Sequence, residues 1–274
     1  SADYNDLTNK PVVPTLLGDL SNVSPTAPAL DEVLKWDGSQ WAPGSDVGNI
    51  PTYAEVTDKN TANGPSKIAI GTIAGSTNQG NLAVAIGYEA GKTNQGANSI
   101  AIGVNAGETT QSTNATAVGI SAGETTQGAN ATALGYYAGN ANQGSEAVAI
   151  GDLAGSTNQG ANATAVGNNA GEDTQGISAV AIGDVAGTLN QNTFAVAVGA
   201  SAGMANQGQA AVAIGKNSGE TLQGSDTVAI GNSAGNANQT AKAVAIGDWS
   251  GKTAQGASAV ALGHLAGTTN QGDR

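Results

Sequence analysis

The chain has 274 residues, 41 glycines, no cysteine and a formal net charge of −12 at pH 7. Aromatic residues make up only 3% of it, so few large side chains are available to fill a wide globular core. The absence of cysteine excludes disulfides and thiolate metal sites. The lack of a basic stripe argues against nucleic acid as a partner, and no apolar stretch approaches the length needed for membrane insertion.

The N-terminal quarter differs in composition from the rest, because all seven prolines precede residue 66. Residues 1–48 are expected to form a stem or attachment segment, and residues 49–65 a linker. Within the stem, Asp37-Gly38 is a turn signal between two apolar stretches, which predicts a β-hairpin near residues 33–43. So short and proline-rich a segment could hardly hold a core of its own, so we expect an intertwined collar or shaft stem.

A period of sixteen residues then runs without interruption from Gly71 to Gly263. We call the glycine that opens each unit the first glycine. A second glycine follows four positions later in all thirteen units, from Gly75 to Gly267, and a glutamine follows four positions after that. A third glycine comes directly after the glutamine in ten units; the others carry Ser112, Asn192 and Thr240.

This period is too short for a pair of helices and a turn, but it suits one coil of a β-solenoid. A strict period is required when each coil stacks on the last, because one inserted residue would break the register of every later coil. The absence of proline from residue 66 onward fits a continuous sheet. The sequence therefore predicts an all-β parallel β-solenoid, or β-roll, of thirteen coils over residues 66–274.

Each unit contains a short strand just before its first glycine, as in Val148-Ala149-Ile150. The outer two positions are always Val, Ile, Leu or Thr, and the middle position is always Ala. Successive strand residues face opposite sides, so both faces of the strand are apolar. A solitary solenoid in water should be polar outside. We therefore expect a homotrimer in which these strands line a shared interior, three copies giving a compact prism.

The glutamine recurs at the same position of every unit, and neighbouring coils lie about 4.8 Å apart, so the sequence predicts a ladder of carboxamides. We expect this ladder to hold the coils together; binding of a ligand by the row of glutamines is the alternative. The glycine pair that follows the strand is expected to form a corner of each coil, since glycine permits positive φ. The ladder comprises Gln79, Gln95, Gln111, Gln127, Gln143, Gln159, Gln175, Gln191, Gln207, Gln223, Gln239, Gln255 and Gln271.

The segment Ala-Val-Ala-Ile-Gly-x-x-Ala-Gly, as in residues 147–155, resembles the head repeat of YadA-like trimeric autotransporter adhesins. The resemblance covers about residues 66–272. It implies a left-handed parallel β-roll in which three chains intertwine around one axis. The regular sixteen-residue spacing and the fixed Gln-Gly turn depart from that family's pattern.

The N-terminal residues Asp3-Tyr4-Asn5-Asp6-Leu7-Thr8-Asn9-Lys10-Pro11 resemble a segment of bacteriophage and cyanophage tail fibres. Together with the absence of a visible secretory signal and of a C-terminal membrane barrel, this favours a virion fibre that presents a host-attachment surface. Residues 1–48 would then bind other virion proteins. The alternative is a bacterial trimeric surface adhesin or an extracellular filament subunit.

Candidate contacts with a host surface lie among the variable positions after the first glycine. Tyr136, Tyr137 and Trp249 are candidates for stacking on a glycan, although side chains at these positions are expected more often to cover coil edges or fill grooves between chains. His264, the single histidine, occupies a variable position and no catalytic set can be assembled around it. We expect no enzyme activity, cofactor or metal. An ice-binding array of Thr-Asn pairs is a weaker alternative, because Asp173, Leu189 and Leu222 interrupt it.

Overall fold

The computed structural model describes residues 32–36, 41–45 and 67–273. The chain divides into two units, residues 1–54 and 55–274. In the first unit β1 (Glu32–Trp36) and β2 (Trp41–Ser45) pair antiparallel, with Trp36 opposite Trp41. This pair lies where the sequence predicts a hairpin. The other predictions for the stem and the linker fall outside the described residues.

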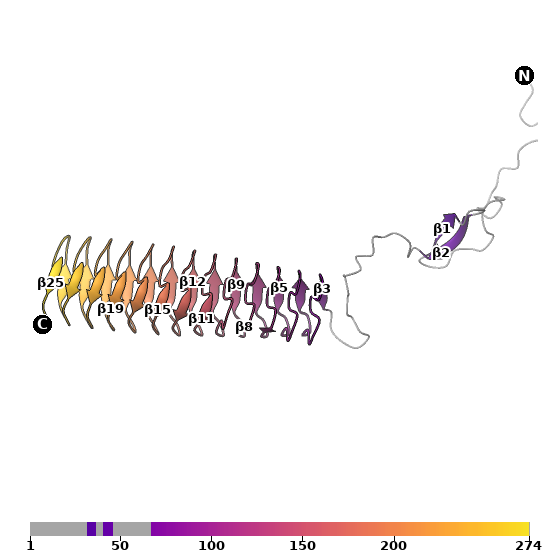
Figure 1. The fold of residues 1–274 in the computed structure, drawn as a ribbon, viewed down its shortest axis with the longest axis horizontal. Helices are drawn as coiled ribbons and strands as arrows, with labels where there is room; N and C mark the ends of the chain where they lie inside the picture. The colour runs from indigo at the N-terminus through magenta and orange to yellow at the C-terminus, as the bar shows by residue number, and fades with distance from the viewer. Residues whose placement is uncertain (1–31, 37–40, 46–66, 274) are drawn as a thin grey trace, which may run out of the picture. The chain divides into compact units, whose positions relative to one another are not determined.

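The second unit is a parallel β-solenoid, which confirms the predicted fold class and coil number (Figure 1). Each coil contributes one short strand to a 13-stranded sheet, and each strand pairs with the same phase of the coils before and after it. Ala149, for example, lies opposite Ala133 and Ala165. The strands are β3 (Ile68–Ile70), β4 (Val84–Ile86), β5 (Ile100–Ile102), β7 (Thr116–Val118), β9 (Thr132–Leu134), β10 (Val148–Ile150), β12 (Thr164–Val166), β14 (Val180–Ile182), β16 (Val196–Val198), β18 (Val212–Ile214), β20 (Val228–Ile230), β22 (Val244–Ile246) and β24 (Val260–Leu262).

A second set of strands ends at the ladder glutamines and runs along another side of the coils. Eight of them form one parallel sheet and two more form a separate pair, with isolated bridges continuing the row in the first coils. The sheet contains β11 (Thr157–Gln159), β13 (Asp173–Gln175), β15 (Leu189–Gln191), β17 (Ala205–Gln207), β19 (Thr221–Gln223), β21 (Ala237–Gln239), β23 (Thr253–Gln255) and β25 (Thr269–Gln271); the pair is β6 (Thr110–Gln111) and β8 (Thr126–Gln127).

The core of the solenoid is narrow and built almost entirely from alanine. In the coil around β10, the inward side chains are Ala147, Ala149, Ala154 and Gln159, all 2% exposed or less. Every buried apolar side chain among the described residues is an alanine, and the largest fully buried side chains are ladder glutamines. Small side chains allow the walls of the coil to approach closely, which explains how so few aromatic residues suffice.

The strand alanine faces this core, so the branched side chains on either side of it face outward. Ile150, Ile182 and Ile214, each directly before a first glycine, are 37%, 40% and 39% exposed. Both faces of the strand are therefore apolar, as the sequence predicts, and the alanine face is the inner one. The outer face forms two continuous rows of branched side chains along all thirteen strands. The description covers one chain, so the expected trimer stays a prediction.

Sharp corners require positive φ angles at several positions of each coil. The first glycines have φ between 110° and 136°, and the second glycines between 48° and 55°. In most coils, three further positions have a left-handed φ although they carry no glycine. They are the second residue after the first glycine, the residue directly before the ladder glutamine, and the second residue after the third-glycine position. Asparagine occupies 15 of these 36 residues, because its short side chain tolerates this conformation best. The third-glycine position itself has no positive φ, which fits its replacement by Ser, Asn and Thr.

Candidate functional surfaces

The ladder glutamines lie inside the solenoid and each joins two parts of the fold. In a typical unit, Nε2 of Gln159 donates to the carbonyl of Val148 at 2.9 Å and to Oε1 of Gln175 at 3.0 Å. The first bond ties the glutamine to the strand of its own coil, and the second ties it to the next coil. Hydrogen bonds between consecutive glutamines run from Gln95 to Gln207 and from Gln223 to Gln271. Most of these amides are buried and bonded within the fold, as a structural ladder requires.

The outer face of the 13-stranded sheet is an extended apolar surface, which we call the apolar face. Its two rows are the first and third residues of each strand. The third-residue row contains only Ile, Val and Leu, whereas the first-residue row includes Thr116, Thr132 and Thr164. No charged residue occurs in either row. A continuous apolar stripe of this kind is typical of surfaces that take part in protein–protein contacts.

Tyr136 and Tyr137 form an aromatic pair at one corner of the solenoid. Their ring centroids lie 4.5 Å apart with the rings inclined at 61°, an edge-to-face contact. Tyr136 is 51% exposed, whereas Tyr137 is half-buried and has a left-handed φ of 53°. The exposed ring of Tyr136 is therefore available for stacking, with Tyr137 supporting it.

Trp249 lies on the same corner but in a different environment. It is 39% exposed and has a φ of 59°, and the ammonium group of Lys252 lies 3.4 Å from its ring centroid. Beside it, Asp248 accepts a hydrogen bond from Nδ2 of Asn232 at 2.9 Å and faces Nδ1 of His264 at 3.4 Å. Lys252 covers part of one ring face in a cation–π contact, so a ligand would stack on what remains exposed.

The structure does not bring the three aromatic candidates into one site. Tyr137 and Trp249 occupy the same phase seven coils apart, which at about 4.8 Å per coil separates them by roughly 34 Å. Any glycan contact would therefore use two separate places along the rod. The exposure of Tyr136 and Trp249 leaves both available for such a contact.

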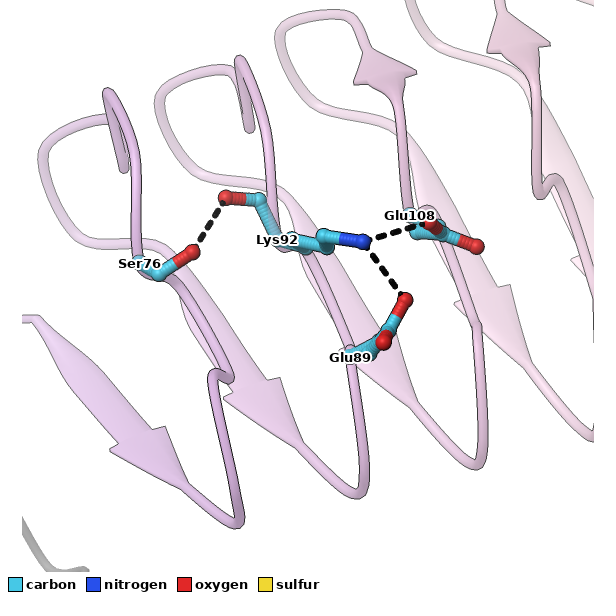
Figure 2. Close-up of polar contacts among 4 residues, drawn as sticks. All are labelled: Ser76, Glu89, Lys92 and Glu108. Atoms are coloured by element: carbon cyan, nitrogen blue, oxygen red, sulfur yellow. Dashed lines mark hydrogen bonds and ion pairs between the residues drawn. The ribbon is translucent and has the colours of Figure 1, made fainter.

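A charged cluster lies near the N-terminal end of the solenoid, where Ser76, Lys92 and Glu108 each directly follow the second glycine of their coil. Nζ of Lys92 lies 2.7 Å from Oε2 of Glu89 and 3.1 Å from Oε1 of Glu108, and Oγ of Ser76 donates to the carbonyl of Lys92 at 3.1 Å (Figure 2). The three coils are thus linked through one lysine. The Lys92 ammonium lowers the pKa of Glu89, and the two carboxylates raise the pKa of Lys92. A hydrogen bond with Glu89 raises the pKa of Tyr88.

These shifts describe a stabilising ion pair rather than a reactive group. They keep Glu89 and Lys92 charged over a wider pH range than usual, which is the opposite of what an acid–base catalyst at neutral pH requires. In the described part of the chain, no group of three or more His, Cys, Asp or Glu side chains is arranged to hold a metal ion. Residues 67–273 also contain no helix that could cross a membrane.

The Thr-Asn surface lies on the side of the solenoid that carries the second set of strands. Exposed asparagines form short amide pairs there: Nδ2 of Asn78, Asn142 and Asn190 donates to the asparagine one coil later at 3.0, 3.1 and 3.1 Å. Many of these amides therefore bond to each other, and the residue before each ladder glutamine has a left-handed φ in eleven coils. The exposed side chains of Leu189 and Leu222 interrupt the surface, as the sequence indicates.

Comparison with known proteins finds no match to a family model, to a curated protein or to a solved structure.

Proposed function

We propose that this chain is a structural fibre protein that assembles as a homotrimer through the apolar face. The observation that supports this proposal is the pair of uncharged branched rows along all thirteen strands of one chain. Water-exposed Val and Ile side chains at such density would make an isolated chain aggregate. Copies of the same chain offer the same length, the same period and the same chemistry, so they are the best-matched cover.

The energetics favour such an assembly. The rows contain two side chains in each of thirteen strands, or 26 in all. Removing the remaining exposure of each contributes on the order of 0.5–1 kcal/mol, so the gross gain per chain is roughly 13–26 kcal/mol. Association itself costs an estimated ~4–15 kcal/mol. A rotational arrangement around one axis lets every chain cover its neighbours with the same surface, and three narrow coils fill such a prism compactly.

The fibre function follows from the shape and chemistry of the solenoid. Thirteen coils at about 4.8 Å each form a rod of roughly 60 Å. Each coil is bonded to the next through backbone hydrogen bonds and packing, and most neighbouring coils are also joined by a hydrogen bond between ladder glutamines, so no joint depends on one contact alone. In our proposal the rod belongs to a virion tail fibre or appendage, residues 1–48 attach it to other virion proteins, and its exposed corner contacts a host glycan or protein. A bacterial trimeric surface adhesin or filament subunit is the alternative, and it would use the rod in the same way.

The assembly is tested by the molecular mass of the native protein. Sedimentation equilibrium should give three times the chain mass for the natural sequence. Ile150→Lys places a charge on the apolar face and should yield monomers or misassembled protein. Asn168→Lys adds the same charge at a phase where Lys216 occurs naturally, so it should leave the trimer intact. A soluble, fully folded monomer of the natural sequence would overturn the proposal.

Host contact requires a separate test, because a trimer can form without binding anything. Adsorption of purified fibres to host cells should fall with Tyr136→Ala or Trp249→Ala if either ring contacts a receptor. Phe194→Ala is a matched control, since Phe194 is also aromatic, 56% exposed and left-handed in φ, but lies on another corner. Unchanged adsorption in both tyrosine and tryptophan variants would remove these residues from the contact.

A further inference from the structure

The residue directly after each first glycine is exposed in all thirteen coils, and together these residues form what we call the corner row. The row changes character along the rod. In four consecutive coils it carries large aliphatic or aromatic side chains that are 44% to 51% exposed: Tyr88, Val104, Ile120 and Tyr136. From the coil of β10 onward it is polar, charged or small, with Asp152, Asn168, Asp184, Ala200, Lys216, Asn232, Asp248 and His264. We call these two stretches the apolar part and the polar part of the corner row.

The apolar part of the corner row continues the apolar face of the 13-stranded sheet. Tyr88 follows Ile86, the last residue of β4, and only Gly87 lies between them, so their Cα atoms are at most about 7 Å apart. In these four coils the two outward rows of the strand and the corner row are all apolar except at Thr116 and Thr132. The apolar surface is therefore three rows wide over these coils, and two rows wide from the coil of β10 onward.

The charged side chains beside this stretch already have partners within the chain. Between the first glycine and the ladder glutamine, the same four coils carry four charged residues: Glu89, Lys92, Glu108 and Glu124. Lys92 pairs with both Glu89 and Glu108, whose side chains are only 15% and 19% exposed (Figure 2). Glu124 accepts a hydrogen bond from Nδ2 of Asn140 at 2.7 Å. Paired and shielded charges lose less when a protein surface covers them than free charges do.

We propose that the apolar part of the corner row packs against the next copy of the chain, which makes the contact between copies wider in these four coils than in the rest of the rod. This inference rests on the homotrimer proposed above. A second copy has the same sixteen-residue period, so its coils follow one another at the same spacing and the rows of the two chains stay matched. In a rotational assembly each copy contacts the next through two different surfaces, here the corner row of one and the apolar face of the other.

The chemistry of the stretch favours a protein surface over a sugar. Its two central residues, Val104 and Ile120, are aliphatic and offer no ring on which a sugar could stack. The absence of charge and the tyrosines at both ends are typical of the central part of a protein–protein interface. Tyr136 then belongs to the contact between copies. Trp249, beside the exposed Asp248 of the polar part, remains the candidate for contact with the host.

Single cysteines test whether this stretch is covered, because the natural chain contains none. Val104→Cys and Ile120→Cys each place a thiol in the apolar part. Ala200→Cys and Asn232→Cys are the controls, since both positions lie in the polar part and are exposed in the single chain. Each control lies one coil from Lys216 and one coil from an aspartate of the row, so the opposite effects of these charges on the thiolate fraction partly cancel.

In the assembled full-length protein, the two apolar-part variants should react with a water-soluble maleimide more slowly than the two controls, by roughly tenfold or more, because access governs the reaction. In a single chain all four positions are exposed, and all four rates would be similar. Equal rates in a protein whose sedimentation mass is that of a trimer would overturn this inference and leave the trimer intact; they are also the result expected if a glycan or another protein covers the stretch. A monomeric mass would overturn the proposed function, and this inference with it.

A second measurement shows what the stretch contributes to the assembly. Asparagine occurs at this phase in the polar part, so the double variant Val104→Asn, Ile120→Asn should leave the coil intact and weaken the contact between copies. Exchange of subunits between tagged and untagged trimers should become faster by roughly tenfold or more. Asn168→Ala with Lys216→Ala truncates two side chains of the polar part and should leave the exchange rate within about twofold of that of the natural protein. Equal exchange rates in the two double variants would contradict the wider contact.

Discussion

The tightest constraint on a single residue lies at the first glycine of each coil. Gly151 has a φ of 132°, and a Cβ built there would meet the carbonyl oxygen of Gly167 in the next coil. Two separate penalties therefore act on any larger residue: the backbone conformation and the collision between coils. Gly263, the first glycine of the last coil, has a φ of 110°, but no atom lies within 4 Å of the position that its Cβ would occupy.

This difference allows the two penalties to be separated by experiment. Gly151→Ala should destabilise the protein by about 3 kcal/mol or more, whereas Gly263→Ala should cost only ~1–2 kcal/mol for its backbone conformation. Denaturant unfolding of the two variants measures both values. Equal losses would show that conformation alone explains the glycine at this phase.

Branched residues at left-handed positions allow a test in the opposite direction, because their replacement by asparagine should raise the stability of the solenoid. Val185 has a φ of 50°, a conformation in which a β-branched side chain is strained. Val185→Asn should stabilise the solenoid by about 1 kcal/mol, measured as a higher denaturation midpoint. Asn169→Val makes the reverse change at the same phase one coil earlier, although it also removes the hydrogen bond from Asn169 to Glu172. It should therefore destabilise by a similar amount or more. A loss of stability in Val185→Asn would contradict the strain at this corner.

The sequence predicts some of these residue-level features and conceals others. Glycine at two invariant phases predicts a corner after each strand, since no other residue serves there equally well. The remaining left-handed corners are occupied by Asn, Ser, Leu, Tyr and even Val, so no single residue type marks them. Frequent asparagine at three phases was the available signal. It is blurred because tertiary packing forces other residues into the same conformation.

At the scale of one element, the glutamine ladder is the feature whose removal is most informative. Gln159→Leu would leave the carbonyl of Val148, Nε2 of Gln143 and Oε1 of Gln175 each without one hydrogen bond inside the solenoid. Unpaired buried groups cost about 1–3 kcal/mol each, so a loss of ~2–4 kcal/mol is expected in thermal or denaturant unfolding. Gln209→Leu is the control, because Gln209 is exposed and lies outside the ladder. A loss below about 0.5 kcal/mol for Gln159→Leu would show that the ladder is not stabilising.

The period of the glutamines predicts bonds between coils, but not the bond from each amide to its own coil's strand. That second bond depends on which side of the strand faces inward, and the sequence leaves this open because both faces are apolar. The structure places alanine inside and the branched residues outside. A coil this narrow has room for alanine but not for two branched side chains on each level. Size, rather than hydrophobicity, decides the orientation.

At the scale of the whole molecule, the solenoid should tolerate changes in length only in whole coils. Deletion of residues 151–166 removes sixteen residues and rejoins equivalent phases, so every ladder stays in register. The variant should fold, retain the oligomeric state of the natural protein and be shorter by about 4.8 Å. Deletion of residues 151–158 would join positions half a coil apart and should abolish folding. Circular dichroism and small-angle scattering distinguish the two results.

The thirteen-coil architecture follows from the sequence more completely than the surfaces do. A strict period determines stacking because each coil repeats the contacts of the last. Surface function has no comparable repetition: Tyr136 and Trp249 occur at the same corner, but the structure places them in different surroundings, one beside Tyr137 and the other beneath Lys252. The sequence period predicts that Tyr136 and Trp249 lie on separate coils, but it does not predict which side chains lie beside them.

The buried glutamines also give the rod an electrical direction. Between Gln95 and Gln207 each Nε2 points toward the following coil and each Oε1 toward the preceding one. The carboxamide dipoles consequently add, as peptide dipoles do in a helix, with the negative pole toward the N-terminal coils and the positive pole toward the C-terminal ones. In a trimer three such parallel columns would reinforce one another. An anionic group would then be attracted more strongly to the C-terminal tip than to the base.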